Sequence, residues 1–244
     1  MFKSLTALTV LSLALAAPAM ASDAKVQGFV EGSSDYLYRG QSVTNDKPAV
    51  SAGLQITDLV VDGTFASVKG TTVDVGDLDR NGKIRAEYEV GYVKAFANRY
   101  SLAVSVARVQ NPVLYTEDYT ETRLTGAVRL TDKLFATGEY AQILTTKVGN
   151  DRYAALGLEY KGLVVDELSA GVKASYQSYD LSGRSEFNNA ELYATYALTK
   201  NVEAFGSYSW GGKSITHATD AFSFLDYRAS SLRDQGQVGL RVRF

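Results

Sequence analysis

The sequence predicts an all-β protein, a transmembrane antiparallel up-and-down β-barrel of twelve strands that follows a cleaved signal peptide. Three observations predict this fold. Apolar and polar residues alternate with a period of two along most of the chain. The connections between the alternating segments are long and short in turn. The chain ends on Phe244, with apolar residues at every second position before it.

Composition narrows the function classes. The 244 residues include 25 Lys and Arg against 27 Asp and Glu, no Cys and a single His, His217. The balanced charge argues against a nucleic-acid partner, and the absence of Cys excludes disulfide scaffolds and Cys-ligated metals. Sixteen Tyr and 21 Gly against three Pro are typical of β-sheet. We therefore expect no cofactor and no bound nucleic acid.

Residues 1–21 have the pattern of a signal peptide. Lys3 precedes an apolar stretch over 5–16, and Ala19-Met20-Ala21 provides the small residues of a cleavage site. Cleavage after Ala21 would leave 22–244 as the barrel domain. No other apolar stretch approaches the length of a transmembrane helix, and no linker or internal repeat is evident, so we predict one exported domain.

The clearest strand runs from Ile84 to Tyr92, where apolar residues take the even positions and Arg85, Glu87 and Glu89 take odd ones. A helix would mix the two sets, because its neighbours lie three and four residues apart. The same reading along the chain predicts twelve strands, near 26–38, 48–57, 64–75, 83–95, 100–110, 119–130, 134–144, 152–160, 168–179, 188–198, 202–210 and 235–244.

The connections between these strands differ at the two expected ends of the barrel. Three of the five even-numbered connections are tight turns, at 97–99, 131–133 and 199–201. The odd-numbered connections are polar and longer, and the last of them runs from Gly211 to Asp234. Long loops on one rim and tight turns on the other are the layout of an outer-membrane barrel.

We expect the apolar faces to point toward lipid and the charged faces toward a wet lumen. Closure into a barrel then gives every backbone N–H and C=O a partner in hydrocarbon. Glu139 and Glu159 join the charged inner face, and the near balance of signs predicts weak ion selectivity. The candidate pore-lining residues are Arg39, Arg85, Glu87, Glu89, Glu121, Arg123, Arg129, Lys173, Glu191, Glu203, Arg241 and Arg243.

Two further sets of residues fit a membrane barrel. Val238, Leu240, Val242 and Phe244 form a candidate C-terminal insertion signal for the barrel-assembly machinery. Aromatic residues at strand ends predict interfacial girdles. The expected girdle residues are Tyr36, Tyr38, Tyr115, Tyr119, Tyr176, Tyr179, Tyr208 and Trp210 on the outer rim, and Phe96, Tyr100, Tyr160 and Phe244 on the periplasmic rim.

The stretch from Ser34 to Val50, SDYLYRGQSVTNDKPAV, resembles the N-terminal signature of the TorF-type putative porin family, S-x-Y-x-x-R-G-x-S followed by a short loop and P-A. The stretch from Glu87 to Tyr92 is similar to a second, less specific family pattern, whereas 66–72 departs from it. The resemblance implies an outer-membrane barrel with porin activity. In the residues themselves, Arg39-Gly40 would end the first strand, with Arg39 turned either toward Asp35 or a lumen acid, or outward at the rim.

The leading hypothesis is a non-enzymatic channel for passive diffusion of small polar solutes or ions across the outer membrane of a Gram-negative bacterium. The expected partners are outer-membrane lipid and lipopolysaccharide, periplasmic chaperones, the assembly machinery and the solute. One alternative is an outer-membrane phospholipase or protease, which would use His217 with Ser214 and Asp220. The other is a structural or adhesive barrel that binds a partner through 211–234. Asp74 to Asp79 is acidic, but it lacks the further ligands of a calcium loop.

Overall fold

A computed structural model describes residues 24–44, 46–73, 84–97, 99–111, 118–144, 151–179, 185–211 and 234–244. The expected signal peptide, the acidic stretch 74–79 and the residues at 214, 217 and 220 lie outside the described residues. Among the residues that are described, no helix is long and apolar enough to cross a membrane.

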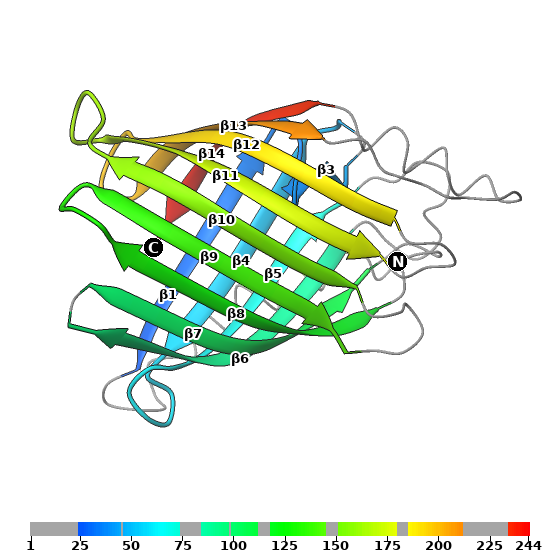
Figure 1. Cartoon of the computed structure of the whole chain (residues 1–244), viewed down its shortest axis with the longest axis vertical. Helices are drawn as coiled ribbons and strands as arrows, with labels where there is room; N and C mark the ends of the chain where they lie inside the picture. The colour runs from blue at the N-terminus through cyan, green and yellow to red at the C-terminus, as the bar shows by residue number, and fades with distance from the viewer. Residues whose placement is uncertain are drawn as a thin grey trace, which may run out of the picture.

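Twelve antiparallel strands close into one barrel, in the order in which they occur along the chain (Figure 1). The closure pairs β1 with β14, so that this sheet has no free edge. The predicted all-β barrel is therefore confirmed. The strands of the barrel are β1 (Lys25–Ser33), β4 (Ala49–Thr57), β5 (Thr64–Thr72), β6 (Ile84–Phe96), β7 (Tyr100–Gln110), β8 (Tyr119–Arg129), β9 (Leu134–Ile143), β10 (Arg152–Lys161), β11 (Leu168–Tyr179), β12 (Ser185–Ala197), β13 (Val202–Gly211) and β14 (Gln235–Arg243).

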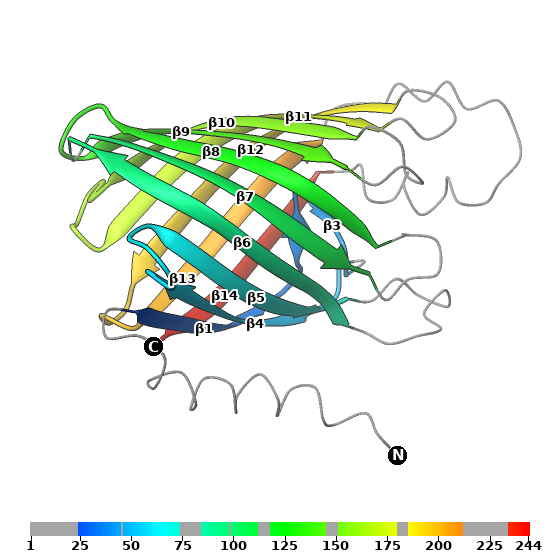
Figure 2. The same cartoon turned by 90° about the horizontal axis from the view of Figure 1, so that it is seen from below.

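The two ends of the barrel differ. The chain terminus at Phe244 lies at the end that carries the β6–β7 connection and the turns 130–133 and 198–201, which we call the short-turn end (Figure 2). The opposite end is called the long-connection end. At the short-turn end, Asp58 adopts a positive φ of 60°, and its carboxylate accepts a hydrogen bond from the Gly63 amide at 2.9 Å. This bond, together with Lys25 at 3.5 Å, lowers the pKa of Asp58 below its usual value of 3.8.

Odd-numbered residues face the lumen in all twelve strands. Residues paired across neighbouring strands always share parity, as Lys69 and Glu87 do, so one face continues around the whole barrel. The large apolar side chains that are exposed on the strands carry even numbers, with Val93 as the exception. Apolar residues therefore cover the outside of the barrel, as the sequence predicts.

The first predicted strand differs from the structure. β1 ends at Ser33, and the chain then folds into a short hairpin of β2 (Leu37–Tyr38) and β3 (Gln41–Ser42). Arg39 and Gly40 have φ values of 53° and 79°, the pattern of a two-residue type I′ turn. We call residues 34–44 the mouth hairpin. Arg39-Gly40 thus forms the tip of this hairpin rather than the end of a barrel strand.

Several inward aromatic rings lie against glycines of the neighbouring strand. Tyr193 faces Gly171 across β12 and β11, and a Cβ atom at Gly171 would lie 2.4 Å from the tyrosine ring. Phe205 pairs with Gly239 in the same manner. A glycine lets each ring lie close to the wall, because there is no side chain beneath it. These pairs keep large side chains from extending across the lumen.

Candidate functional site

The mouth hairpin lies inside the barrel at the long-connection end. Its residues contact side chains from strands all around the wall: Arg39 bonds Glu121 of β8, Tyr36 bonds Lys69 of β5, and the Ser42 amide bonds Gln235 of β14. Only a segment within the lumen can reach strands that lie on different sides of a closed sheet. The hairpin therefore narrows the lumen at this end.

Arg39 anchors the tip of the hairpin. Its guanidinium donates to both carboxylate oxygens of Glu121, at 3.0 and 3.1 Å, and lies 3.9 Å from Glu139. It also stacks on Tyr153, with 4.3 Å to the ring centroid. The Arg39 side chain is 8% exposed and that of Glu121 is fully buried. A charge-assisted, two-bond anchor of this kind fixes both position and orientation.

The carboxylate of Asp35 closes the base of the hairpin. It accepts hydrogen bonds from the hydroxyls of Ser42 and Thr44 and from the Tyr36 amide. Asp35 is 2% exposed. Of the alternatives for Arg39, the lumen acid is thus the partner, while Asp35 binds the hairpin itself. The bonds to Glu121 direct Arg39 toward the lumen.

Three aromatic residues expected in the outer girdle belong to this site instead. The Tyr119 hydroxyl donates to that of Tyr38 at 3.2 Å, and Arg85 lies 4.0 Å above the Tyr38 ring. Tyr36 is 8% exposed and bonds Lys69. The girdle prediction is therefore wrong for Tyr36, Tyr38 and Tyr119. Tyr36 and Tyr38 belong to the mouth hairpin, which turns into the lumen after Ser33, and Tyr119 occupies an odd, lumen-facing position of β8. In contrast, Tyr176, Tyr208 and Trp210 are exposed on even, outward positions.

Ion pairs run along the wall below the hairpin. Arg123 of β8 reaches over the small residues of β7 to Glu87 at 2.7 Å and Glu89 at 3.2 Å on β6, and it also bonds Glu121 at 2.6 Å. Arg85 lies 3.6 Å from Glu87. Opposite charges thus neutralise one another on one side of the lumen.

Two further ion-pair groups lie on the inner face. Lys173 bonds Glu191, its direct cross-strand partner, at 2.6 Å. Nearer the short-turn end, Arg241 bridges Glu31 at 2.6 Å and Glu203 at 2.7 Å. Arg243 also bonds Glu203, at 2.9 Å. These charges pair with neighbours on adjacent strands, so their side chains lie along the wall.

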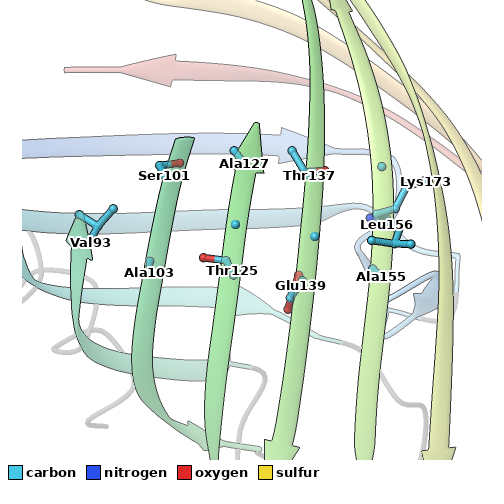
Figure 3. Close-up of a pocket in the computed structure, with 13 residues that line it drawn as sticks. Val93, Ser101, Ala103, Thr125, Ala127, Thr137, Glu139, Ala155, Leu156 and Lys173 are labelled. Atoms are coloured by element: carbon cyan, nitrogen blue, oxygen red, sulfur yellow. The ribbon is translucent and has the colours of Figure 1, made fainter. Parts of the chain in front are cut away.

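Cavities remain in the lumen between the hairpin and the short-turn end. One, of about 310 Å³, is bordered by short side chains of β7 to β9 such as Ser101, Ala103 and Thr125, with Glu139 and Lys173 beside them (Figure 3). Another, of about 630 Å³, lies along β1, β4 to β6 and β14. The described residues include no group of three acidic or His side chains arranged to hold a metal ion.

Eleven of the twelve candidate pore-lining residues lie on barrel strands, and all eleven have odd numbers and face the lumen. The twelfth, Arg39, reaches the lumen from the mouth hairpin. Arg129 and Arg243 lie at the short-turn rim, where Arg129 bonds Asp132 at 2.6 Å. Sequence reasoning missed Glu31 and Lys69, although both occupy odd positions between apolar residues. Their odd position numbers alone would have placed them on the inner face.

The sequence also contains an internal repeat, which was not expected above and whose two copies the structure places in the barrel. When 52–71 is aligned with 156–175, nine of the 20 positions are identical, including Leu-Val-Val-Asp in both turns and a lysine in both second strands. The two copies form the hairpins β4–β5 and β10–β11. Four strands separate them in either direction around the barrel, so they lie on opposite walls. Lys69 and Lys173 are thus equivalent positions.

Comparison with solved structures places this fold among outer-membrane barrels. The KdgM porin matches with a TM-score of 0.58 at 12% identity, covering 90% of this chain and 99% of the porin. The NanC porin matches with a TM-score of 0.57 at 10% identity, covering 89% and 98%. The COG4313 outer-membrane channel from Pseudomonas putida F1 matches with a TM-score of 0.50 at 13% identity, covering 89% and 94%. No known family profile and no curated protein sequence matches the chain. The shared feature is the fold, a transmembrane β-barrel of outer-membrane type.

Proposed function

We propose that this protein is a porin-like channel for small polar solutes in the bacterial outer membrane, and that the mouth hairpin sets its width. The observation that carries the proposal is a closed barrel with an apolar exterior and a charged inner face that encloses cavities. A barrel that served only as a membrane anchor could fill its interior with packed side chains. The structural neighbours support the same function, since they include porins, one of them KdgM in complex with disordered oligogalacturonate.

The remaining assignments extend this proposal. The long-connection end would face outward and the short-turn end the periplasm, as in other barrels of this type. Lipid and lipopolysaccharide would surround the even-numbered face, and the assembly machinery would read Val238, Leu240, Val242 and Phe244 during insertion. Membership of the TorF-type porin family remains part of the proposal, and it rests on the hairpin motif from Ser34 onward.

Reconstitution into a planar bilayer tests the channel. Folded protein should produce discrete conductance steps, whereas no steps at any voltage would reject the proposal. His217→Ala separates the channel from the hydrolase alternative, because a pore should conduct equally with either residue. Release of fatty acid or peptide product that disappears in His217→Ala would favour the enzyme instead.

A further inference from the structure

The equivalent lysines of the two repeat copies each lie opposite a glutamate of the next strand, but they differ in the bond that they make. In one copy Lys173 lies opposite Glu191 and bonds it at 2.6 Å. In the other copy Lys69 lies opposite Glu87, but Glu87 is bound by Arg123 at 2.7 Å. Lys69 instead donates to the hydroxyl of Tyr36 at 2.7 Å. Among the described residues, no carboxylate lies within 4.0 Å of the Lys69 ammonium.

Lys69 also borders the cavity of about 630 Å³. The ring of Phe29 is part of the same wall and lies against Gly53, where a Cβ atom would be only 2.5 Å away. Lys69 and Arg241 lie 6.0 and 5.9 Å from the centroid of this ring. The amides of Gln27 and Gln55 and the hydroxyl of Ser67 are also in the lining. The same lining includes the carboxylates of Glu31, Glu87 and Glu89, and each of them is bound by an arginine, Glu31 by Arg241 and the other two by Arg123. The Lys69 ammonium, which has no carboxylate within 4.0 Å among the described residues, therefore shares one space with an aromatic ring, neutral hydrogen-bonding groups and carboxylates that are already paired.

We propose that this cavity is a binding station for sugar acids, in which Lys69 holds the carboxylate and Phe29 stacks on the sugar ring. A charge-assisted hydrogen bond gives the strongest single polar contact available to such a solute. The cations beside it are committed elsewhere, because Arg241 already bridges Glu31 and Glu203. The inference names the solute class of the proposed channel and so rests on that function.

Binding in detergent micelles tests the station without requiring current. Ligand-observed saturation-transfer NMR would compare D-glucuronate with D-glucose, which have the same ring but differ in the carboxylate. Glucuronate should bind, and Lys69→Gln should weaken it roughly tenfold, the loss expected for one charge-assisted bond. Lys69→Arg should retain most of the binding. Equal binding of the two sugars, or an unchanged affinity in Lys69→Gln, would overturn the proposal.

Two controls separate the cation from its surroundings. Tyr36→Phe removes the hydroxyl that Lys69 bonds but keeps the ammonium, so glucuronate should bind at least as well. Binding lost in this variant as in Lys69→Gln would show an effect transmitted through the mouth hairpin, and would overturn the station. The double variant Lys173→Gln/Glu191→Gln removes the equivalent but paired lysine together with its partner. It should bind normally, and a loss equal to that of Lys69→Gln would also refute the assignment.

The station and the channel can fail separately. Conductance steps without glucuronate binding would refute the sugar-acid binding site but not the channel function. Specific glucuronate binding by a barrel that never conducts would refute the channel function but not the binding site, and the protein would then be a periplasm-facing binding protein.

Discussion

Replacement of Arg39 by Met should release the mouth hairpin. The variant loses two hydrogen bonds to Glu121, at 3.0 and 3.1 Å, and the stacking on Tyr153 at 4.3 Å. Hydrogen bonds to charged groups contribute about 1.5–3 kcal/mol each, and a desolvated cation–π contact contributes about 2 kcal/mol. Two such hydrogen bonds at the low end of this range already give about 3 kcal/mol, so the variant should lose at least this much of the free energy that holds the hairpin in place. This loss would raise the fraction of molecules with a displaced hairpin about 100-fold.

The barrel itself should tolerate this change. Glu121 keeps its bond to Arg123 at 2.6 Å, so no buried carboxylate loses its last partner. Arg243→Met is the matched control, because it removes an inner-face arginine whose partner Glu203 keeps Arg241 at 2.7 Å, far from the hairpin. Circular dichroism and heat-dependent electrophoretic mobility would check that both variants are folded.

Single-channel recording in a planar bilayer measures the outcome. Arg39→Met should show larger or more frequent open levels than the unaltered protein, whereas Arg243→Met should not. Arg39→Lys, which keeps the charge but cannot make the two-bond fork, should lie between them. Folded Arg39→Met protein with unaltered step size and open probability would refute the view that the hairpin limits conduction.

Other variants test the barrel wall. Val104→Arg puts a charge on the lipid face and should destabilise the barrel by about 2–4 kcal/mol in urea unfolding from lipid vesicles, whereas Ala103→Arg on the inner face should cost far less; equal costs would contradict the assigned facing. Gly171→Ala should push the Tyr193 ring into the lumen and reduce conductance, since the added Cβ would lie 2.4 Å from that ring; an unchanged conductance would show that the ring moves elsewhere. Asp58→Asn should destabilise the barrel at neutral pH, because folding favours the ionised form of Asp58. The difference in unfolding free energy between the variant and the unaltered protein should shrink below about pH 3.8 and vanish as pH falls through the lowered pKa of the native carboxyl. A difference that persists in acid would refute this cause.

Most of the wall could be predicted from the sequence because a strand period of two is a local property. The alternation of Arg85, Glu87 and Glu89 with apolar neighbours is enough to define both the strand and its two faces. Turn residues then show where each strand stops. Neither inference needs to know which strands become neighbours.

The mouth hairpin could not be predicted in this way. Tyr36 and Tyr38 continue the even-numbered apolar pattern of β1, so alternation alone extends the strand through them. The chain leaves the wall because Asp35 bonds Ser42 and Thr44 across a turn closed by Gly40. The decisive partners, such as Glu121, are distant in sequence, and contacts of that separation have no local signature.

The repeat shows how the hairpin changes the chemistry of the wall around it. Equivalent hairpins would place Lys69 and Lys173 in equivalent ion pairs, and one of them does form that pair, with Glu191. On the other wall, the mouth hairpin supplies Tyr36 to the lysine while Arg123 occupies Glu87. A sequence-level count of charges treats the two lysines alike. The asymmetric insertion of one short segment therefore leaves Lys69, alone of these two equivalent lysines, without a carboxylate within 4.0 Å among the described residues. The matched Lys69 and Lys173 variants measure that asymmetry directly.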